Sequence, residues 1–442
     1  MRASLLATDR QFAQQSYYVA TAATAAPGAR YPALTESIAC DVAVVGGGLA
    51  GLSAALELAE RGFDVVLLEA HQIGWGASGR NGGQAIHGLA CEQSTIEAQL
   101  GLDEARRVWA MSLEALDLLR LRIQRHAIDC DWRDGYLGLA TTPGKGAALA
   151  RWADGMQARY GFELQRIAPP DMGAWIASPR FHSGVHDPRS GHLHPLKYTR
   201  GLACAAVQAG VRIHELSAVL GLAQGTPACL RTAAGDVRAS RVLLAGNVYL
   251  EGLAPALAAR VMPVGTYIAC TEVLDPARAD ALIPSRAAVC DTNLVLDYFR
   301  TTNDHRMLYG GRVSYSTRTP RNLAQSMQAR MVRTFPQLAG VAIDYTWGGF
   351  VDVTMNRAPD FGRLPHPAGA PENIYYLQGF SGHGLALTGL AGRFVAEAMA
   401  GDARRFDVFA RLRHRRFPGG RMLRTPALVL GMAWARLHDM LG

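Results

Sequence analysis

The sequence predicts an α/β fold, α+β over the whole chain, in which a Rossmann-like domain on a parallel sheet is joined to a second domain with a mainly antiparallel sheet. Three observations support this prediction. Residues 41–69 read as strand, glycine turn, helix and strand. Residues 372–401 repeat the order of strand, glycines and helix near the other end of the chain. Residues 261–345, in contrast, are rich in short strand-like runs.

The first of these units has the spacing of a dinucleotide-binding turn. Val42 to Val45 form an apolar run that leads into Gly46, Gly48 and Gly51, which fit the pattern G-x-G-x-x-G. The first glycine tightens the turn, the second lets backbone approach a pyrophosphate, and the third lets the helix pack on the strand. The unpaired N–H groups and the positive dipole end of the helix then face the phosphates.

Two segments that follow can also contact a nucleotide. The second strand, residues 65–68, is followed directly by Glu69, whose carboxylate can accept hydrogen bonds from both hydroxyls of an adenosine ribose. Residues 73–84, IGWGASGRNGGQ, are rich in glycine and small residues, as expected where backbone must approach a ligand closely. Arg80 and Asn81 add a cation and an amide to that stretch.

The remaining segments are assigned by pattern. We expect an arm over residues 1–37 that lies on the surface, with Tyr17 and Tyr18 packed there. An amphipathic helix is predicted over 103–126. Residues 181–195 carry four histidines without a recognisable metal pattern, so we expect a loop near a ligand and no metal site.

Strand and glycine signals recur in the second half of the chain. An apolar strand over 242–245 ends at Gly246, a small turn able to abut a nucleotide. A strand over 374–377 runs into Gly382 and Gly384, after which a helix begins. That helix start predicts a second site where backbone N–H groups meet an electron-rich group.

Composition excludes several classes of protein. With 442 residues, 49% of them hydrophobic, the chain can form two domains. Of the net charge of +8, the segment 401–442 contributes +6, from nine arginines and three acids, so the charge is local and a nucleic-acid partner is not expected. Seven dispersed cysteines, no apolar run of membrane-spanning length and no signal-peptide pattern favour a cytoplasmic protein.

These motifs resemble those of a known family. GGGLAG with Glu69, GASGRNGGQ, MNRAPDFG (355–362) and GFSGHGLAL are similar to the D-amino-acid oxidase superfamily of FAD enzymes, which includes glycine and sarcosine oxidases. The resemblance covers nearly the whole chain and is strongest to the bacterial branch that oxidises gamma-glutamylputrescine. It implies an FAD domain of the glutathione-reductase type and a substrate domain over the flavin ring. The implied ranges are 1–37 for the arm, 38–100, 181–260 and 346–405 for the FAD domain, 101–180 and 261–345 for the substrate domain, and 406–442 for a basic amphipathic tail.

The resemblance also implies the residues that hold FAD. They are Gly46, Gly48, Leu49, Ala50, Gly51, Glu69, Ala70, Ala77, Ser78, Gly79, Arg80, Asn81, Gly82, Gly83, Gln84, Val219, Gly246, Gly382, His383, Gly384 and Leu385. Some relatives attach flavin through a late cysteine or through a histidine in the second glycine-rich stretch. Here no cysteine follows Cys290, and the only nearby histidines, His71 and His87, flank that stretch. We therefore expect FAD to be bound non-covalently.

The implied activity is amine oxidation in putrescine catabolism. A neutral primary amine would transfer hydride to flavin and give an imine or aldehyde, ammonia and, with molecular oxygen as acceptor, hydrogen peroxide. No catalytic side chain is assigned, because the amine itself supplies the electrons. The pocket candidates are the walls Trp75, Tyr298, Trp347 and His383, with Arg80 or Arg312 left for a substrate carboxylate.

Three alternatives stay open. The substrate could be L-pipecolate or another amino acid. The enzyme could instead be a flavin dehydrogenase that passes electrons to a membrane quinone, with residues 426–441 lying on the membrane surface as peripheral contact. A non-catalytic flavoprotein or a nucleic-acid-modifying enzyme is supported only by the local charge of the tail.

Overall fold

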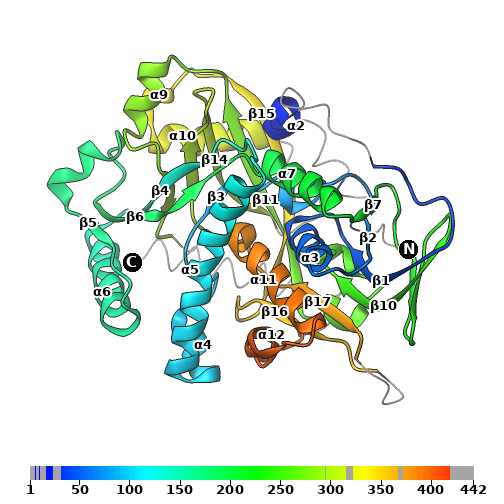
Figure 1. Ribbon diagram of the computed structural model, residues 1–442. Helices are drawn as coiled ribbons and strands as arrows, with labels where there is room; N and C mark the ends of the chain where they lie inside the picture. Colours follow the sequence, from blue (N-terminus) through cyan, green and yellow to red (C-terminus); the bar gives the residue numbers. More distant parts are fainter. Residues whose placement is uncertain are drawn as a thin grey trace.

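The computed structural model describes residues 16–22, 31–293, 295–314, 322–366 and 372–418, together with Leu5 and Asp9, and for residues 312–314 it describes the backbone alone. The strands of these residues form two sheets (Figure 1). No helix within the described ranges is both long and apolar enough to cross a membrane.

The first sheet has eight strands and a parallel centre. Its path runs through β16 (Asp360–Arg363), β17 (Ile374–Gln378), β10 (Asp236–Leu244), β1 (Ile38–Val45), β2 (Val65–Leu68) and β7 (Arg212–His214), with β9 (Ala228–Arg231) and β8 (Gly221–Ala223) extending beside β10. The neighbours from β17 to β7 are parallel, and β16 is antiparallel. Three distant parts of the chain therefore end their strands at one edge of this sheet, where ligands of open α/β sheets bind.

Helices cover this sheet and are tied together by a buried charge cluster. The helices that pack in the core of this sheet are α3 (Leu49–Ala59), α4 (Gln93–Leu100), α5 (Leu102–Arg125), α7 (Pro195–Gln208), α11 (Gly384–Met399) and α12 (Arg404–Ala410). Glu57 of α3 pairs with Arg122 of α5 at 2.9 Å and with Arg393 of α11 at 3.0 Å. Because burial of one charge without its partners is costly, this cluster fixes three helices against one another.

The second sheet has nine strands and is mainly antiparallel. Its path is β15 (Ile343–Thr354), β11 (Val261–Thr271), β14 (Met307–Ser314), β13 (Tyr298–Thr301), β12 (Ala288–Asp291), β4 (Arg133–Ala140), β6 (Ser183–His192) and β3 (Gln84–Ala85), with β5 (Gln165–Ile167) beside β6. The β12–β4 pair is parallel and the other pairs are antiparallel. The predicted fold class is confirmed.

The two faces of the second sheet have different neighbours. Phe299 and Tyr309 lie in a buried cluster with Met327 and Phe335, on the side of α10 (Leu323–Thr334) and α9 (Pro276–Leu282), which Figure 1 shows at the top of the view. Successive side chains of a strand point to opposite faces. Tyr298 therefore points the other way, toward the glycine-rich segment that follows β2.

Two local predictions are wrong. Tyr17 and Tyr18 do not pack on the surface: they lie in α2 (Tyr17–Ala22) with 3% and 0% of their surface exposed, because their rings fit between α7 and the second sheet. Most of residues 181–195 form β6 instead of a loop, because their backbone pairs with three strands.

The domain ranges stay a prediction. β3, β6 and β15 belong to the second sheet, although much of their sequence lies in ranges expected for the FAD domain. The expected helix over 103–126 is confirmed as α5.

Candidate functional site

The turn between β1 and α3 needs glycine at two positions. Gly46 has a φ of 114°, and a Cβ atom there would lie 2.6 Å from the carbonyl oxygen of Ala245. A Cβ atom on Gly51 would lie 2.0 Å from the carbonyl oxygen of Gly46. The absence of side chains therefore permits both the tight turn and the close start of the helix, as a pyrophosphate cradle requires.

Glu69 is held at the end of β2 by backbone donors. The N–H of Gly47 donates to its Oε2 at 2.7 Å, and the N–H of His71 donates to its Oε1 at 2.8 Å. Burial raises the pKa of Glu69, and these two N–H groups oppose that rise. Each carboxylate oxygen keeps a second lone pair, so the group can still accept two hydroxyl donors.

The second glycine-rich stretch folds directly against the first turn. Ser78, in η2 (Ala77–Gly79), accepts a hydrogen bond from the N–H of Leu49 at 2.9 Å. Asn81 donates to the carbonyls of Ala77 and Ser78, and its Oδ1 accepts from the N–H of Gly83. The two motifs, separated in sequence, thus form one continuous backbone surface at the N-terminus of α3.

Arg80 is buried and already paired. Its side chain is 4% exposed, and Nη1 lies 2.9 Å from Oδ1 of Asp9. The Nε of Arg80 donates to the carbonyl of Trp75 at 2.5 Å. The backbone carbonyl of Arg80 accepts a hydrogen bond from Nε1 of Trp347 at 2.9 Å. The Nη2 of Arg80 is buried and has no hydrogen-bond partner among the described residues. The expectation that Arg80 receives a substrate carboxylate stays a prediction.

A second helix begins at the expected GHG segment. Gly379, Ser381 and Gly382 have φ values of 76°, 52° and 84°, and His383 is the residue before α11. Nε2 of His383 lies 2.8 Å from the carbonyl oxygen of His87. Burial lowers the pKa of His383 to about 4, so the imidazole is neutral near pH 7.

A buried carboxyl group supports the turn that precedes α11. Oδ2 of Asp352, on β15, accepts from the N–H of Gly379 at 2.5 Å, and its carbonyl accepts from the N–H of Ser381. Burial raises the pKa of Asp352 to about 7, although those N–H groups favour the ionised form. The GHG turn therefore rests on a group whose charge changes near neutral pH.

The face of the second sheet meets the glycine-rich stretch at Tyr298. A Cβ atom on Gly82 would lie 2.7 Å from this ring, and one on Gly310 would lie 2.1 Å from it. Two neighbouring hydrogen bonds also join the second sheet to the glycine-rich stretch. Arg300 Nε donates to the carbonyl of Gly82 at 2.9 Å, and Cys290 Sγ donates to Oε1 of Gln84 at 3.0 Å.

The other candidates occupy varied positions. Trp75 stacks on His71 with ring centres 4.0 Å apart. Val219 packs beside the core on the β8–β10 side of the first sheet. Gly246 lies next to Gly46, across the paired ends of β1 and β10. Arg312 is in β14, and its side chain lies outside the described residues.

The sequence interpretation missed three residues of this region: Asp9, Tyr18 and Arg300. They are 0%, 0% and 3% exposed, and each hydrogen-bonds next to the second glycine-rich stretch. The tyrosine pair was a signal for Tyr18. Local pattern carries no signal for Asp9 or Arg300, because their partners are distant in sequence.

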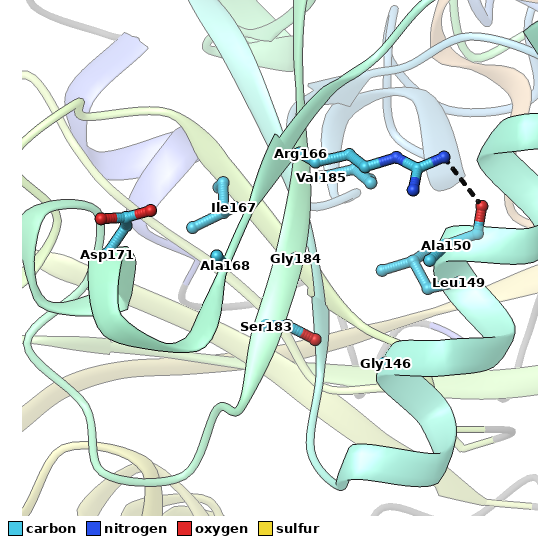
Figure 2. A pocket seen from close by; sticks show the side chains of 10 residues that line it. All are labelled: Gly146, Leu149, Ala150, Arg166, Ile167, Ala168, Asp171, Ser183, Gly184 and Val185. Carbon is cyan, nitrogen blue, oxygen red and sulfur yellow. Dashed lines mark hydrogen bonds between the residues drawn. The ribbon is translucent and has the colours of Figure 1, made fainter.

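A separate cavity of about 260 Å³ lies between α6 (Pro143–Tyr160), β5, η3 (Pro169–Ala174) and β6. Figure 2 shows Arg166 and Ser183 at its wall, with Arg166 directed to the carbonyl of Ala150. None of the residues predicted to bind cofactor or substrate lines it. Among the residues that the structure describes, no group of three histidines, cysteines or acids could hold a metal ion.

Comparisons with known proteins agree on one family. The sequence model of the family described as "FAD dependent oxidoreductase" (DAO) matches residues 41–398. The chain is 46% identical over 429 residues to gamma-glutamylputrescine oxidoreductase of Escherichia coli K12, covering 97% of this chain and 98% of that protein. It is 39% identical to the probable oxidoreductase OrdL of Haemophilus influenzae, over 93% of this chain and 94% of that one.

A solved structure shows the same fold. Glycine oxidase from Geobacillus kaustophilus is similar with a TM-score of 0.68 at 22% identity, covering 82% of this chain and 95% of that chain.

Proposed function

The chain belongs to the FAD-dependent oxidoreductase (DAO) family, and from that premise we propose that it oxidises a primary amine with a distant carboxylate, a compound like gamma-glutamylputrescine. The observation that carries the proposal is the 46% identity to gamma-glutamylputrescine oxidoreductase over nearly the full length of both proteins. We further propose that molecular oxygen is the electron acceptor, that hydrogen peroxide is a product and that the reaction belongs to putrescine breakdown.

The residues present fit FAD. Because Gly46 and Gly51 have no side chains, the backbone at the start of α3 is accessible to a ligand, which supports a pyrophosphate site there. Leu49, Ala50 and Gly48 would contact the same phosphates. Two N–H donors hold the carboxylate of Glu69 in place, which supports its role at the adenosine ribose.

The second glycine-rich segment would lie along the rest of the cofactor. The segment 77–84 runs from the N-terminus of α3 to the face of the second sheet, which supports its predicted path toward the flavin ring. Ala70, Val219 and Gly246 would line the nucleotide end. We propose that the cofactor is held by these contacts without a covalent link.

The start of α11 would stabilise negative charge. When bound, FAD supplies the acceptor for the two electrons that leave the amine. Gly384 and Leu385 begin a helix of 16 residues, whose first N–H groups and positive dipole end favour an anionic group beside them. His383 would contribute there as a neutral side chain, because burial lowers its pKa to about 4.

The walls of the pocket would keep the reacting amine neutral. Tyr298 and Trp347 lie on the face of the second sheet that turns toward Gly82 and Arg80, where an apolar surface disfavours a charged ammonium group. Trp75 and His383 are proposed nearer the cofactor. Arg312 remains the proposed partner of the substrate carboxylate, since Arg80 already pairs with Asp9.

The proposal is tested by aerobic turnover of the purified protein without membranes. With gamma-glutamylputrescine we expect oxygen uptake together with equal amounts of ammonia and peroxide. Turnover that appears only after a quinone is added would support the dehydrogenase alternative. Residues 426–441, which that alternative places on the membrane surface, lie outside the described residues.

A further inference from the structure

Two residues that precede the family match lie inside the candidate site. The family model begins at residue 41, yet Asp9 and Tyr18 are completely buried beside the second glycine-rich stretch. Each contacts a buried arginine, Asp9 contacting Arg80 and Tyr18 contacting Arg300. The N-terminal residues are therefore a part of this site that the family match does not include.

Asp9 provides the counter-charge for Arg80. Its Oδ1 lies 2.9 Å from Nη1 of Arg80, and the hydroxyl of Tyr249 donates to its other oxygen. With that charge neutralised, Arg80 donates to the carbonyls of Trp75 and Gly348. Removing one partner of a buried ion pair leaves an uncompensated charge, so Arg80 depends on Asp9 to stay in this position.

Tyr18 provides the matching contact for Arg300. Its hydroxyl lies 3.2 Å from Nη2 of Arg300, and the same nitrogen donates to the carbonyl of Leu193 at 3.0 Å. Nε of Arg300 donates to the carbonyl of Gly82 at 2.9 Å. No carboxylate among the described side chains forms an ion pair with Arg300, so its donors are directed by neutral oxygens, and Tyr18 supplies one of them.

Both arginines hold the same piece of backbone. Arg80 bonds to the carbonyl of Trp75, near the start of the glycine-rich stretch, and Arg300 bonds to the carbonyl of Gly82, near its end. A glycine-rich segment has great conformational freedom, so contacts from outside must fix it. Asn81 and Arg80 support the segment from within, and Arg300 of β13 supports it from outside.

We propose that Asp9 and Tyr18 are positioning residues for FAD. Asp9 fixes Arg80, which belongs to residues 75–83, and Tyr18 fixes Arg300, which binds that segment from β13; together these contacts hold residues 75–83 in the shape that receives the cofactor. This inference rests on the proposed role of that segment in FAD binding. It assigns the N-terminal residues to the cofactor site, and neither side chain needs to touch FAD.

The chain offers a matched pair for the test. Tyr17 and Tyr18 are neighbours on α2 with rings 5.6 Å apart, and both are buried. The hydroxyl of Tyr17 donates to Oδ1 of Asp304 at 2.6 Å, whereas that of Tyr18 reaches Arg300. Tyr17→Phe and Tyr18→Phe each remove one buried hydroxyl and keep the ring, but only the second change touches the support of the glycine-rich segment.

The readouts are FAD affinity and backbone protection in the full-length protein. FAD is titrated by equilibrium dialysis, and hydrogen exchange is followed in peptides covering residues 75–84. We expect Tyr18→Phe to raise the Kd for FAD about tenfold, in line with the loss of a hydrogen bond to a charged group. Exchange in those peptides should also become faster. Tyr17→Phe should leave Kd within about twofold of the wild-type value.

Asp9→Asn extends the test to Arg80. It should raise the Kd for FAD at least as much as Tyr18→Phe, because it removes the counter-charge. If Asp9→Asn does not fold, Tyr18→Phe alone decides. Equal Kd values and equal exchange for Tyr17→Phe, Tyr18→Phe and wild type would overturn the inference. A wild-type protein that does not bind FAD would instead overturn the proposed function.

Discussion

Replacing Glu69 with alanine tests the cofactor site at its most defined point. Its two carboxylate oxygens accept from the N–H groups of Gly47 and His71, at 2.7 and 2.8 Å. Because those donors fix the carboxylate before any ligand binds, its remaining lone pairs are directed toward the proposed ribose. Glu69→Ala removes both proposed hydroxyl contacts and frees the two N–H groups.

The expected loss is large. A hydrogen bond to a charged group contributes about 1.5–3 kcal/mol, so two of them contribute about 3–6 kcal/mol to FAD binding. Burial already disfavours the ionised carboxylate, since it raises the pKa of Glu69, and this offsets part of the gain. We therefore expect the lower end of the range, an increase of about 100-fold in the Kd for FAD.

The assay is an FAD titration of the full-length variant, followed by flavin fluorescence. Glu60→Ala is the control, because Glu60 lies on the same β1–α3–β2 unit but pairs with Arg125 at the far end of α3. Glu60→Ala should bind FAD like the wild type. The reasoning is refuted if Glu69→Ala retains FAD as tightly as Glu60→Ala, or if it retains FAD and loses only the chemical step.

Three further predictions concern the cofactor link, a buried charge cluster and pH. Acid precipitation should leave free FAD in the supernatant, and flavin in the pellet would show a covalent link. Glu57→Ala should lower the free energy of unfolding by about 3–5 kcal/mol in urea titrations, because Arg122, 3% exposed, loses its partner; a loss below about 1 kcal/mol would contradict the predicted role of that pair. Burial raises the pKa of Asp352 to about 7, so this group stabilises the fold fully below its unfolded pKa of about 4, and that contribution is lost as pH rises through about 7. Asp352→Asn, which resembles the neutral form, should therefore gain stability relative to wild type as pH rises from about 4 to about 7, with a constant difference above that range, and a difference that does not change with pH would contradict the raised pKa.

Local sequence pattern was sufficient for the parts of the fold whose cause is local. The β1–α3 turn could be predicted because two of its requirements are local: Gly46 has a φ of 114°, and a Cβ atom on Gly51 would lie 2.0 Å from the carbonyl oxygen of Gly46. The close approach of Ala245 to Gly46 is a further, distant requirement that the local pattern does not contain. The start of α11 follows from the same kind of signal at Gly382 and Gly384. The second sheet was predicted as a class from its short strand-like runs, but its strand order was not.

Long-range pairing explains what the sequence did not reveal. The contact between Arg80 and Asp9 could not be predicted, because the two residues lie 71 positions apart in the sequence. The polar segment 181–195 looked like a loop, yet Asp187 is satisfied by His87 at 2.7 Å and by Ser190. Once such polar groups find partners inside the fold, backbone pairing makes the segment a strand.

The central claim is tested most directly by anaerobic mixing of the oxidised protein with a panel of amines, followed by flavin absorbance. The panel contains gamma-glutamylputrescine, putrescine, L-pipecolate and glycine, and the absence of oxygen makes the result independent of the acceptor. We predict rapid bleaching with gamma-glutamylputrescine and slower bleaching or none with the other three. Bleaching by L-pipecolate with gamma-glutamylputrescine inert would contradict the proposed substrate, and a flavin that no amine bleaches would contradict amine oxidation itself.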